Sequence, residues 1–324
     1  MRYPRFKRRE ETSDQNLRGV AISLDELMRR QFLASGFSFL PRQPVHSVLN
    51  GRHASRLRGR GINFEELRGY LPGDDIRGID WKITARAGKP HVRIFNEERD
   101  RPVWLLVDQR ASMFFGSHSN MKSVTAAEAA ALAAWRALAG GDRVGALVFN
   151  DEQLVEFPPQ RSRAQVARIL AAVSNMTHAL VKAGPRAADS SMINRALEHL
   201  GRRLKHDALV CLIGDGLGLD ESSRRLVTGI SAHNDVLCVF IFDPLEQELP
   251  EGGRLSFADV RGQLEMDLAR SREREAFKTD FEQRASWLQG LAQQHAIPIL
   301  TLNTTEPVAA QVRAQLGGTR RARR

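Results

Sequence analysis

Carboxylate and hydroxyl side chains occur in this sequence at positions from which they could bind a divalent cation. Asp108 directly follows the apolar run 103–107, and Asp215 follows the apolar run 208–213 after a single glycine. Ser112 lies four residues past Asp108. If the two runs are the first and fourth strands of an open sheet whose strand order reverses between them, both carboxylates converge on one crevice. Carboxylate and hydroxyl oxygens suit Mg²⁺ with several waters retained, so the spacing indicates a candidate metal site.

Each of these side chains also has an ordinary structural alternative. Ser190 and Ser191 open a helical stretch, and Ser112 lies where the helix after the first strand is expected to begin, so all three serines could be helix caps. An aspartate that follows a strand often accepts hydrogen bonds from loop amides. Spacing alone therefore leaves open both a metal site and a set of caps and turns.

Other reaction chemistries lack their motifs. The segment 214–218 is Gly-x-Gly-x-Gly, which departs from the Gly-x-Gly-x-x-Gly spacing of dinucleotide-binding loops. The sequence contains no phosphate-binding Gly-x-x-x-x-Gly-Lys-Ser/Thr, no Gly-x-Ser-x-Gly elbow and no His-x-x-x-His zinc pair. A metal-dependent hydrolase or phosphotransferase at Asp108 and Asp215 stays as an alternative, although Arg110 stands where an aspartyl-phosphate enzyme needs a second acid.

The elements that would position these side chains follow from the apolar pattern. Short apolar runs, mostly unbroken by charge, are typical of strands covered on both faces; they are 103–107, 144–149, 208–213, 236–242 and 297–302. Longer stretches with helical spacing lie between or after them, at 121–138, 163–173, 192–204, 222–232 and 274–295. This alternation predicts an α/β fold with a doubly wound, mostly parallel sheet. The segment 255–268 interrupts the pattern and is predicted to form a surface hairpin.

The first hundred residues have a different texture. Leu24, Leu27, Met28 and Phe32 recur at helical spacing and predict a short amphipathic helix behind a basic tail, both within residues 1–40. Frequent glycines between 41 and 101 predict a small, turn-rich β module.

Residues 56–86 form the densest polar constellation of the chain, with opposite charges interleaved with aromatic side chains. One interpretation is a set of internal ion pairs that hold turns together. The other is an interaction surface, because Arg, Tyr and Trp dominate binding hot spots. The partner-binding candidates on this interpretation are Arg60, Tyr70, Asp74, Asp75, Arg77, Asp80 and Trp81.

The formal net charge of +10 invites the hypothesis of a nucleic-acid partner. However, residues 1–9 contain five basic residues and no acid, and residues 320–324 contain four basic residues, so the two ends supply +9 of the +10. Nucleic-acid binding through these tails is therefore the weaker alternative, and it predicts a steep dependence on salt.

Two cysteines, Cys211 and Cys238, lie inside apolar runs, which excludes a disulfide framework and favours a reducing cytoplasm. They are predicted to be packing residues. Apolar runs long enough for a membrane span or a signal peptide are absent from the sequence, and this also favours a cytoplasmic location.

Residues 51–81, which overlap the polar constellation, also contain an ordered series of short motifs. Residues 51–53, 59–61, 64–68, 70–77 and 79–81 are Gly-Arg-His, Gly-Arg-Gly, Phe-Glu-Glu-Leu-Arg, Tyr-Leu-Pro-Gly-Asp-Asp-Ile-Arg and Ile-Asp-Trp. This string resembles the signature of the bacterial domain-of-unknown-function family 58. The resemblance implies a von Willebrand factor A-like domain over 102–316, preceded by the β module 41–101 and followed by a basic tail, 317–324. It also implies an adaptor that works with a MoxR-type AAA+ ATPase in the assembly or maturation of a client protein.

Domains of the A type commonly have a metal-ion-dependent adhesion site, built from Asp-x-Ser-x-Ser, a threonine and a further aspartate. By resemblance, Asp108, Ser112, Ser191 and Asp215 fall at four of the five positions, with Ser191 in place of threonine. Arg110 takes the place of the middle serine. Its fixed positive charge opposes Mg²⁺, so the resemblance predicts a degenerate site with weak or lost affinity for Mg²⁺. The guanidinium could pair with Asp108 or Asp215, or could receive a partner's carboxylate directly.

The leading hypothesis is thus a cytoplasmic, non-enzymatic adaptor that binds a AAA+ ATPase and its client, with no certain cofactor.

Overall fold

The computed structural model describes residues 17–37, 63–70, 79–96, 101–183, 188–248, 254–259, 262–267 and 271–317. The chain divides into two compact units. The larger consists of Met1–Pro41 with Arg101–Arg324, and the smaller of Arg42–Asp100. The short N-terminal helix therefore belongs to the larger unit rather than to a separate tail.

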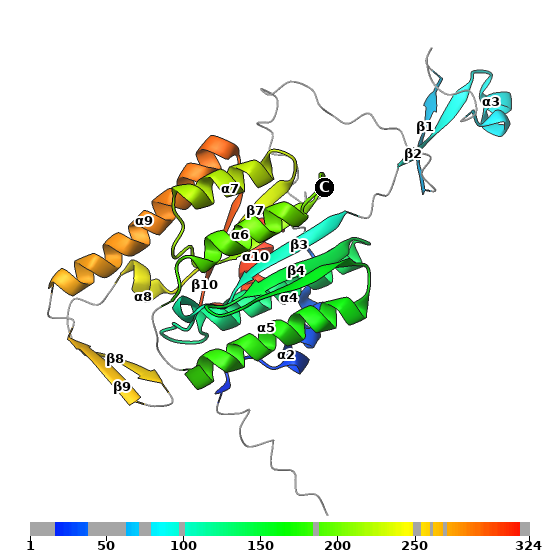
Figure 1. The fold of residues 1–324 in the computed structure, drawn as a ribbon. Coiled ribbons are helices and arrows are strands. Elements are labelled where there is room, and N and C mark those ends of the chain that lie inside the picture. Colours follow the sequence, from blue (N-terminus) through cyan, green and yellow to red (C-terminus); the bar gives the residue numbers. More distant parts are fainter. Residues whose placement is uncertain are drawn as a thin grey trace, which may run out of the picture. The chain divides into compact units, whose positions relative to one another are not determined.

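A six-stranded sheet forms the centre of the larger unit (Figure 1). The strands are β3 (Pro102–Asp108), β4 (Arg143–Phe149), β5 (Leu154–Gln160), β6 (Leu209–Gly214), β7 (Asp235–Phe242) and β10 (Ile299–Asn303). Their order is β10-β7-β6-β3-β4-β5, and every neighbouring pair is parallel except β4 and β5. The doubly wound, mostly parallel sheet predicted from the sequence is confirmed, and its order reverses between β3 and β6.

Strand β5 is the one strand of this sheet that the apolar pattern did not predict. It contains Pro158 and Pro159, and a proline cannot donate a hydrogen bond to a neighbouring strand. The structure places β5 at the edge, where it pairs with β4 alone. An edge position tolerates prolines that a central strand would not.

Helices cover both faces of the sheet (Figure 1). One face is covered by α4 (Lys122–Ala139), α5 (Arg163–Ala183) and α10 (Val308–Leu316), and the other by α6 (Met192–Arg203), α7 (Glu221–Ser231) and α9 (Ser271–His295). Strand side chains alternate between the two layers: Val103, Leu105 and Val107 point to the first, and Trp104 and Leu106 to the second. None of the helices within the described ranges combines the length and the hydropathy required to cross a lipid bilayer.

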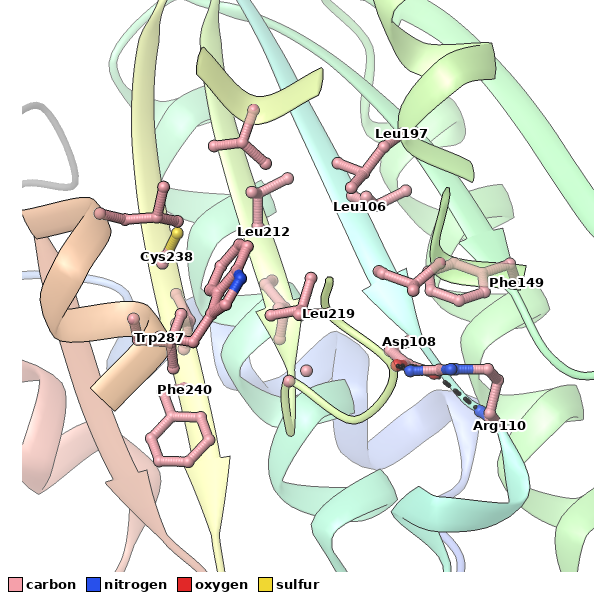
Figure 2. Close-up of a pocket in the computed structure, with 18 residues that line it drawn as sticks. Leu106, Asp108, Arg110, Phe149, Leu197, Leu212, Leu219, Cys238, Phe240 and Trp287 are labelled. Atoms are coloured by element: carbon pink, nitrogen blue, oxygen red, sulfur yellow. Dashed lines mark hydrogen bonds and ion pairs between the residues drawn. The ribbon is translucent and has the colours of Figure 1, made fainter. Parts of the chain in front are cut away.

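A small cavity lies in the second layer, between the sheet and helices α6, α7 and α9 (Figure 2). Its volume is about 50 Å³, and its lining is almost entirely apolar, with Asp108 and Arg110 as its charged residues. An engineered cavity that holds benzene has about 150 Å³, so this one is too small for a ring-sized ligand. Cys238 also lines it, and burial raises the pKa of both thiols, Cys211 and Cys238, to about 12. Both cysteines are free and buried, as predicted for packing residues.

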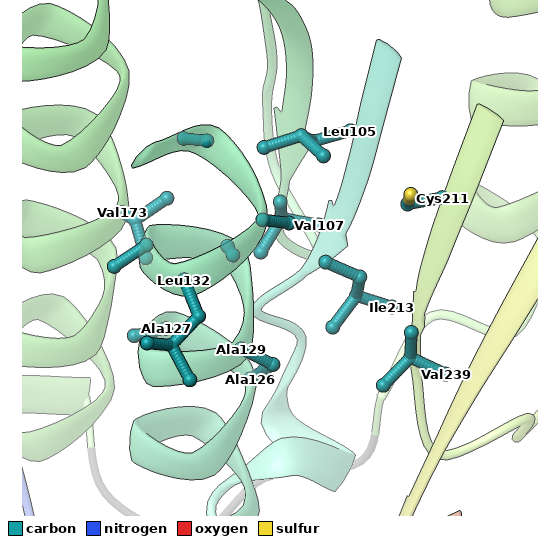
Figure 3. Close-up of a cluster of buried hydrophobic side chains, with 14 of the residues drawn as sticks. Leu105, Val107, Ala126, Ala127, Ala129, Leu132, Val173, Cys211, Ile213 and Val239 are labelled. Carbon is teal, nitrogen blue, oxygen red and sulfur yellow. The ribbon is translucent and has the colours of Figure 1, made fainter. Parts of the chain in front are cut away.

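The first layer is built around α4, whose residues 122–135 are all buried (Figure 3). Its many alanines let the helix lie close to the sheet, to α5 and to α10. The remaining side of α4 is covered by α2 (Leu24–Arg29) and the 3₁₀ turn η2 (Arg30–Leu33). Leu27 is buried there, Trp135 Nε1 donates to Leu27 O (3.3 Å), and Arg30 forms an ion pair with Glu128. The predicted N-terminal amphipathic helix is thus part of the core of this unit.

Two smaller features complete the larger unit. The hairpin predicted at 255–268 is present as β8 (Arg254–Asp259) paired with β9 (Gly262–Asp267). A short helix, α8 (Pro244–Gln247), follows β7 directly.

The smaller unit contains an antiparallel pair, β1 (Asn63–Gly69) with β2 (His91–Asn96), and the helix α3 (Trp81–Ala87) between them. Asp80 begins α3 as its N-cap and accepts hydrogen bonds from the amides of Lys82 (3.0 Å) and Ile83 (3.2 Å). Gly88 ends it with a φ of 69°, a left-handed conformation that glycine adopts without strain.

Candidate functional site

The two aspartates singled out by the sequence lie at the point where the strand order of the sheet reverses. Asp108 ends β3, and Asp215 follows β6, the neighbouring strand. Both are buried, with exposed fractions of 2% and 1%. The convergence expected from their positions after the two strands is therefore present in the fold.

Arg110 is paired with Asp108 inside the protein. Its Nε donates to Asp108 Oδ1 (3.0 Å) and Oδ2 (3.1 Å), and its Nη2 donates to Oδ2 (2.6 Å). The exposed fraction of Arg110 is 0%. The hypothesis that Arg110 receives a partner's carboxylate does not fit this geometry, because Asp108 already fills the fork of the guanidinium (Figure 2). The structure has the alternative arrangement, an internal pair.

Two loop carbonyl oxygens also accept hydrogen bonds from the guanidinium of Arg110. Arg110 Nη1 donates to Asp189 O (3.1 Å), and Nη2 also donates to Leu217 O (2.8 Å). The Gly-x-Gly-x-Gly segment accounts for the second contact, because Gly216 and Gly218 have φ values of 72° and 79° and turn the backbone around Leu217. The glycine segment after β6 thus helps to bind an internal arginine.

Lys122, the first residue of α4, is a second buried cation at this site, with an exposed fraction of 2%. Its Nζ donates to Asp215 Oδ2 (2.9 Å) and to Glu246 Oε1 (2.8 Å). Arg284, on α9, donates from Nη2 to Glu246 Oε1 (3.1 Å) and from Nη1 to Asp215 O (2.9 Å). We refer to these side chains together as the ion-pair network: Asp108, Arg110, Lys122, Asp215, Glu246 and Arg284.

The six buried side chains of the ion-pair network are balanced in charge, with three carboxylates and three cations, and Arg284 also contacts the exposed Asp280 (2.9 Å). Burial alone would raise the pKa of Asp215, but the surrounding cations, Lys122 foremost, hold that pKa well below its ordinary value. Burial would lower the pKa of Lys122, and the carboxylates of Asp215 and Glu246 raise it instead. At Asp108, burial raises the pKa of the carboxyl against the opposing attraction of Arg110. Lys122 and Arg110 are therefore protonated at neutral pH.

The residues of this site do not fit a divalent metal ion. The carboxylate oxygens that would bind Mg²⁺ are in contact with a guanidinium at Asp108 and with an ammonium at Asp215. Ser112 Oγ is buried and has no hydrogen-bond partner among the described residues. Ser191 is exposed, and its Oγ donates to Asp189 Oδ1 (2.7 Å). No group of three or more His, Cys, Asp or Glu side chains suited to a metal occurs in the part of the chain that the structure describes.

Sequence reasoning missed Lys122, Glu246 and Arg284. A weak signal existed for Glu246, because Asp243-Pro-Leu-Glu246 has the spacing of a capping box, and the structure shows that box at α8. Lys122 is a single charge at the start of an alanine-rich stretch, and a charge at such a position is usually exposed. The sequence offered no signal that Arg284 on α9 reaches the end of β6.

The candidates in the smaller unit have different environments. Asp80 is buried with an exposed fraction of 6%, and its observed role is to cap α3. Tyr70 is half-buried. Trp81 has an exposed fraction of 70%. The other candidates, Arg60, Asp74, Asp75 and Arg77, lie outside the described residues.

The lowered pKa of Asp215 predicts a loss of stability in acid. A carboxyl whose pKa is lower in the folded than in the unfolded protein stabilises the fold above its unfolded pKa, about 3.9, and this contribution is lost as the pH falls. Between pH 4 and pH 3 the wild type should lose about 1 kcal/mol more of its free energy of unfolding than a variant with the neutral pair Asp215→Asn and Lys122→Met. Urea unfolding at both pH values measures the difference. Equal losses would show that Asp215 is not held ionised by its neighbours.

Comparison with known proteins adds a family match. The model of the family described as "Protein of unknown function DUF58" matches residues 66–287, more than half of the chain and a range that includes the whole ion-pair network. Uncharacterized proteins of Mycobacterium bovis and Mycobacterium tuberculosis are each 34% identical over 219 residues, which is 68% of this chain and 67% of each relative.

Solved structures give weaker likenesses. The conserved hypothetical protein BatB from Bacteroides thetaiotaomicron has a TM-score of 0.37 and 13% identity over 65% of this chain and 93% of that chain. The SpRpn10 VWA domain has a TM-score of 0.31 and 9% identity over 66% of this chain and 94% of that chain.

Proposed function

This chain belongs to the DUF58 family of proteins of unknown function, and from that membership we propose that it is a non-enzymatic adaptor that binds other proteins. The observation that supports this most is the ion-pair network. Every carboxylate of the network contacts a cation of the same network, at distances between 2.6 and 3.1 Å. A buried site whose charges are satisfied internally offers no reacting group to a substrate.

An enzymatic alternative would use Asp108 or Asp215 as base or nucleophile. Either role needs an oxygen free to approach a substrate atom. Asp108 is buried under the Arg110 fork, and Asp215 contacts Lys122. A screen of phosphate esters with Mg²⁺ present tests the alternative directly: turnover that disappears with Asp108→Asn would revive a hydrolase or phosphotransferase.

Of the candidate residues that the structure describes, Trp81 has the side chain best suited to contact a partner. It is one of two large apolar side chains that are strongly exposed there, the other being Phe32 at 75%. Exposed Lys82 lies next to it in α3. Tryptophan dominates binding hot spots because it buries a large area and donates one hydrogen bond. We place the partner surface of the smaller unit on this side of α3.

The partner we propose is a MoxR-type AAA+ ATPase, with a client protein as the second partner. This part of the proposal follows from the family resemblance of residues 51–81. It assigns the adaptor to the assembly or maturation of that client.

Replacing Trp81 by alanine should weaken binding to the ATPase by at least about tenfold, because the loss of a hot-spot side chain costs about 2 kcal/mol or more. Biolayer interferometry with the purified MoxR-type ATPase of the same genome, loaded with ADP or with an ATP analogue, measures the affinity. Phe32→Ala is the matched control, because it removes an equally exposed aromatic ring from the larger unit; its affinity should stay within about twofold of the wild type.

Two results would count against these proposals. Failure of the wild-type chain to bind in both nucleotide states would contradict the ATPase partnership. Equal weakening by Trp81→Ala and Phe32→Ala would contradict the specific role of Trp81.

A further inference from the structure

The crevice at the reversal of strand order contains the side chains that a divalent cation would need, together with two side chains that exclude it. Asp108 and Asp215 are the paired carboxylates, and each contacts a cation of the protein itself. The contacts are short, 2.6 Å for Arg110 Nη2 and 2.9 Å for Lys122 Nζ. We propose that Arg110 and Lys122 are built-in replacements for a bound divalent cation, so that this crevice is complete without metal and becomes a metal site when both are removed.

The charge balance of the ion-pair network supports this assignment. Its three buried carboxylates are matched by three cations, and the one further carboxylate in contact with them, Asp280 on Arg284 (2.9 Å), is exposed to solvent. Removal of Arg110 and Lys122 would leave two uncompensated negative charges in a buried crevice, because only Arg284 would remain. A single divalent ion restores the balance, and burial makes that restoration strongly favourable.

The segment that follows Asp108 has two buried side-chain oxygens without a hydrogen-bond partner among the described residues. Ser112 Oγ is buried without a partner in the described part of the chain, four residues from Asp108. The side-chain oxygen of Gln109, the residue after Asp108, is buried and unpartnered in the same way. Replacing Arg110 by serine would add a second hydroxyl between these two residues. Two carboxylates with several neutral oxygens form the kind of hard-oxygen site that Mg²⁺ and Mn²⁺ accept.

A tethered cation behaves differently from a dissolved one. Lys122 and Arg110 are covalently part of the chain, so their occupancy does not depend on the metal concentration of the surroundings. They also avoid the dehydration that makes Mg²⁺ reluctant to enter all-protein sites. The crevice of the wild type should therefore be equally stable in EDTA and in millimolar MgCl₂. This consequence holds whichever partner the protein binds, so it stands apart from the proposed adaptor function.

The test compares the wild-type chain with the double variant Arg110→Ser/Lys122→Met, in which methionine keeps most of the volume of the lysine stem. Mn²⁺ alone is the probe, followed by electron paramagnetic resonance titration and by thermal unfolding in EDTA or in MnCl₂. The double variant should bind one Mn²⁺ at least about tenfold more tightly than the wild type, and Mn²⁺ should raise its unfolding midpoint by at least about 3 °C. The wild-type midpoint should not change.

A matched control separates a metal site from a general response to a broken ion pair. Arg30→Met breaks the partly buried pair Arg30–Glu128, which lies in the same unit but outside the ion-pair network. It should lose stability without any rescue by Mn²⁺. Rescue of Arg30→Met to the same extent as the double variant, or tight Mn²⁺ binding by the wild type that Asp108→Asn abolishes, would overturn the proposal.

A milder variant covers the case in which the double variant does not fold. Lys122→Met alone keeps the Asp108–Arg110 pair, removes the ion pair of the Asp215 side chain and leaves Glu246 with Arg284 as its cation. Mn²⁺ should stabilise this variant more than it stabilises Arg30→Met. If neither Lys122→Met nor the double variant folds even with MnCl₂ present during refolding, a metal ion cannot take the place of these cations, and the proposal is wrong.

Discussion

Replacement of Asp108 by alanine should lower the free energy of unfolding by about 3–5 kcal/mol. The substitution leaves the Arg110 guanidinium in the interior with two carbonyl partners and no carboxylate in contact. An uncompensated buried charge of this kind is among the most destabilising single changes, whereas the intact pair itself contributes little compared with apolar side chains of similar size. Urea unfolding followed by circular dichroism measures the loss.

The double variant Asp108→Ala/Arg110→Met should recover most of this loss, because it removes both charges together. Asp235→Ala is a matched control, since it breaks the ion pair between Asp235 and Arg101 in which the aspartate side chain is 55% exposed. An exposed pair of this kind contributes about 1 kcal/mol or less. Losses of similar size for Asp108→Ala and Asp235→Ala would mean that Arg110 finds solvent when its partner is removed.

Replacement of Leu132 by alanine should lower the free energy of unfolding by about 2–5 kcal/mol. Leu132 lies in the middle of α4 with an exposed fraction of 0%, among the side chains of the first layer (Figure 3). The change removes buried methyl groups and leaves a cavity in the first layer. The neighbouring helix α5 and the sheet cannot fill this cavity without moving.

Leu138→Ala is the control for Leu132→Ala, because it makes the same change in the same helix at a partly buried position. Leu138→Ala alters helix propensity as much as Leu132→Ala does, but it removes less buried area. It should therefore lower the free energy of unfolding by less than half as much. Chemical denaturation of both variants gives the comparison. If the two costs were equal, helix propensity rather than packing would set the stability of α4.

The strands that position the site could be predicted because a parallel strand buried on both faces is a short apolar run. Strands β3, β4, β6, β7 and β10 all fit this rule, and Asp108 and Asp215 were found from their places after β3 and β6. The rule fails for β5, where an edge position permits two prolines. Helix α10 was not predicted either, because its nine residues are too few for a clear periodic signal.

The chemistry of the site could be predicted only in part. Arg110 was recognised because it interrupts a motif, and its pairing with Asp108 was one of the arrangements expected from its charge. Lys122 and Arg284 were not recognised, because a lysine or arginine in a helix is normally exposed and only the tertiary fold shows that these two are buried among carboxylates. For Asp80 the sequence did not separate a helix cap, which the structure shows, from a binding residue, because both roles use the same side chain.

The N-terminal segment that covers α4 has a consequence for the order in which the protein can be completed. The whole smaller unit lies in the chain between residues 17–37 and the six-stranded sheet. The larger unit is therefore a discontinuous domain with an insertion. During synthesis this segment leaves the ribosome before the helix that it must cover. Arg313, which donates to Leu33 O (2.9 Å) and Ser35 O (3.3 Å), is made after every strand of the six-stranded sheet. The first and last described segments therefore close the domain together, and a chain cut at the boundary near residue 101 would lose the cover over α4.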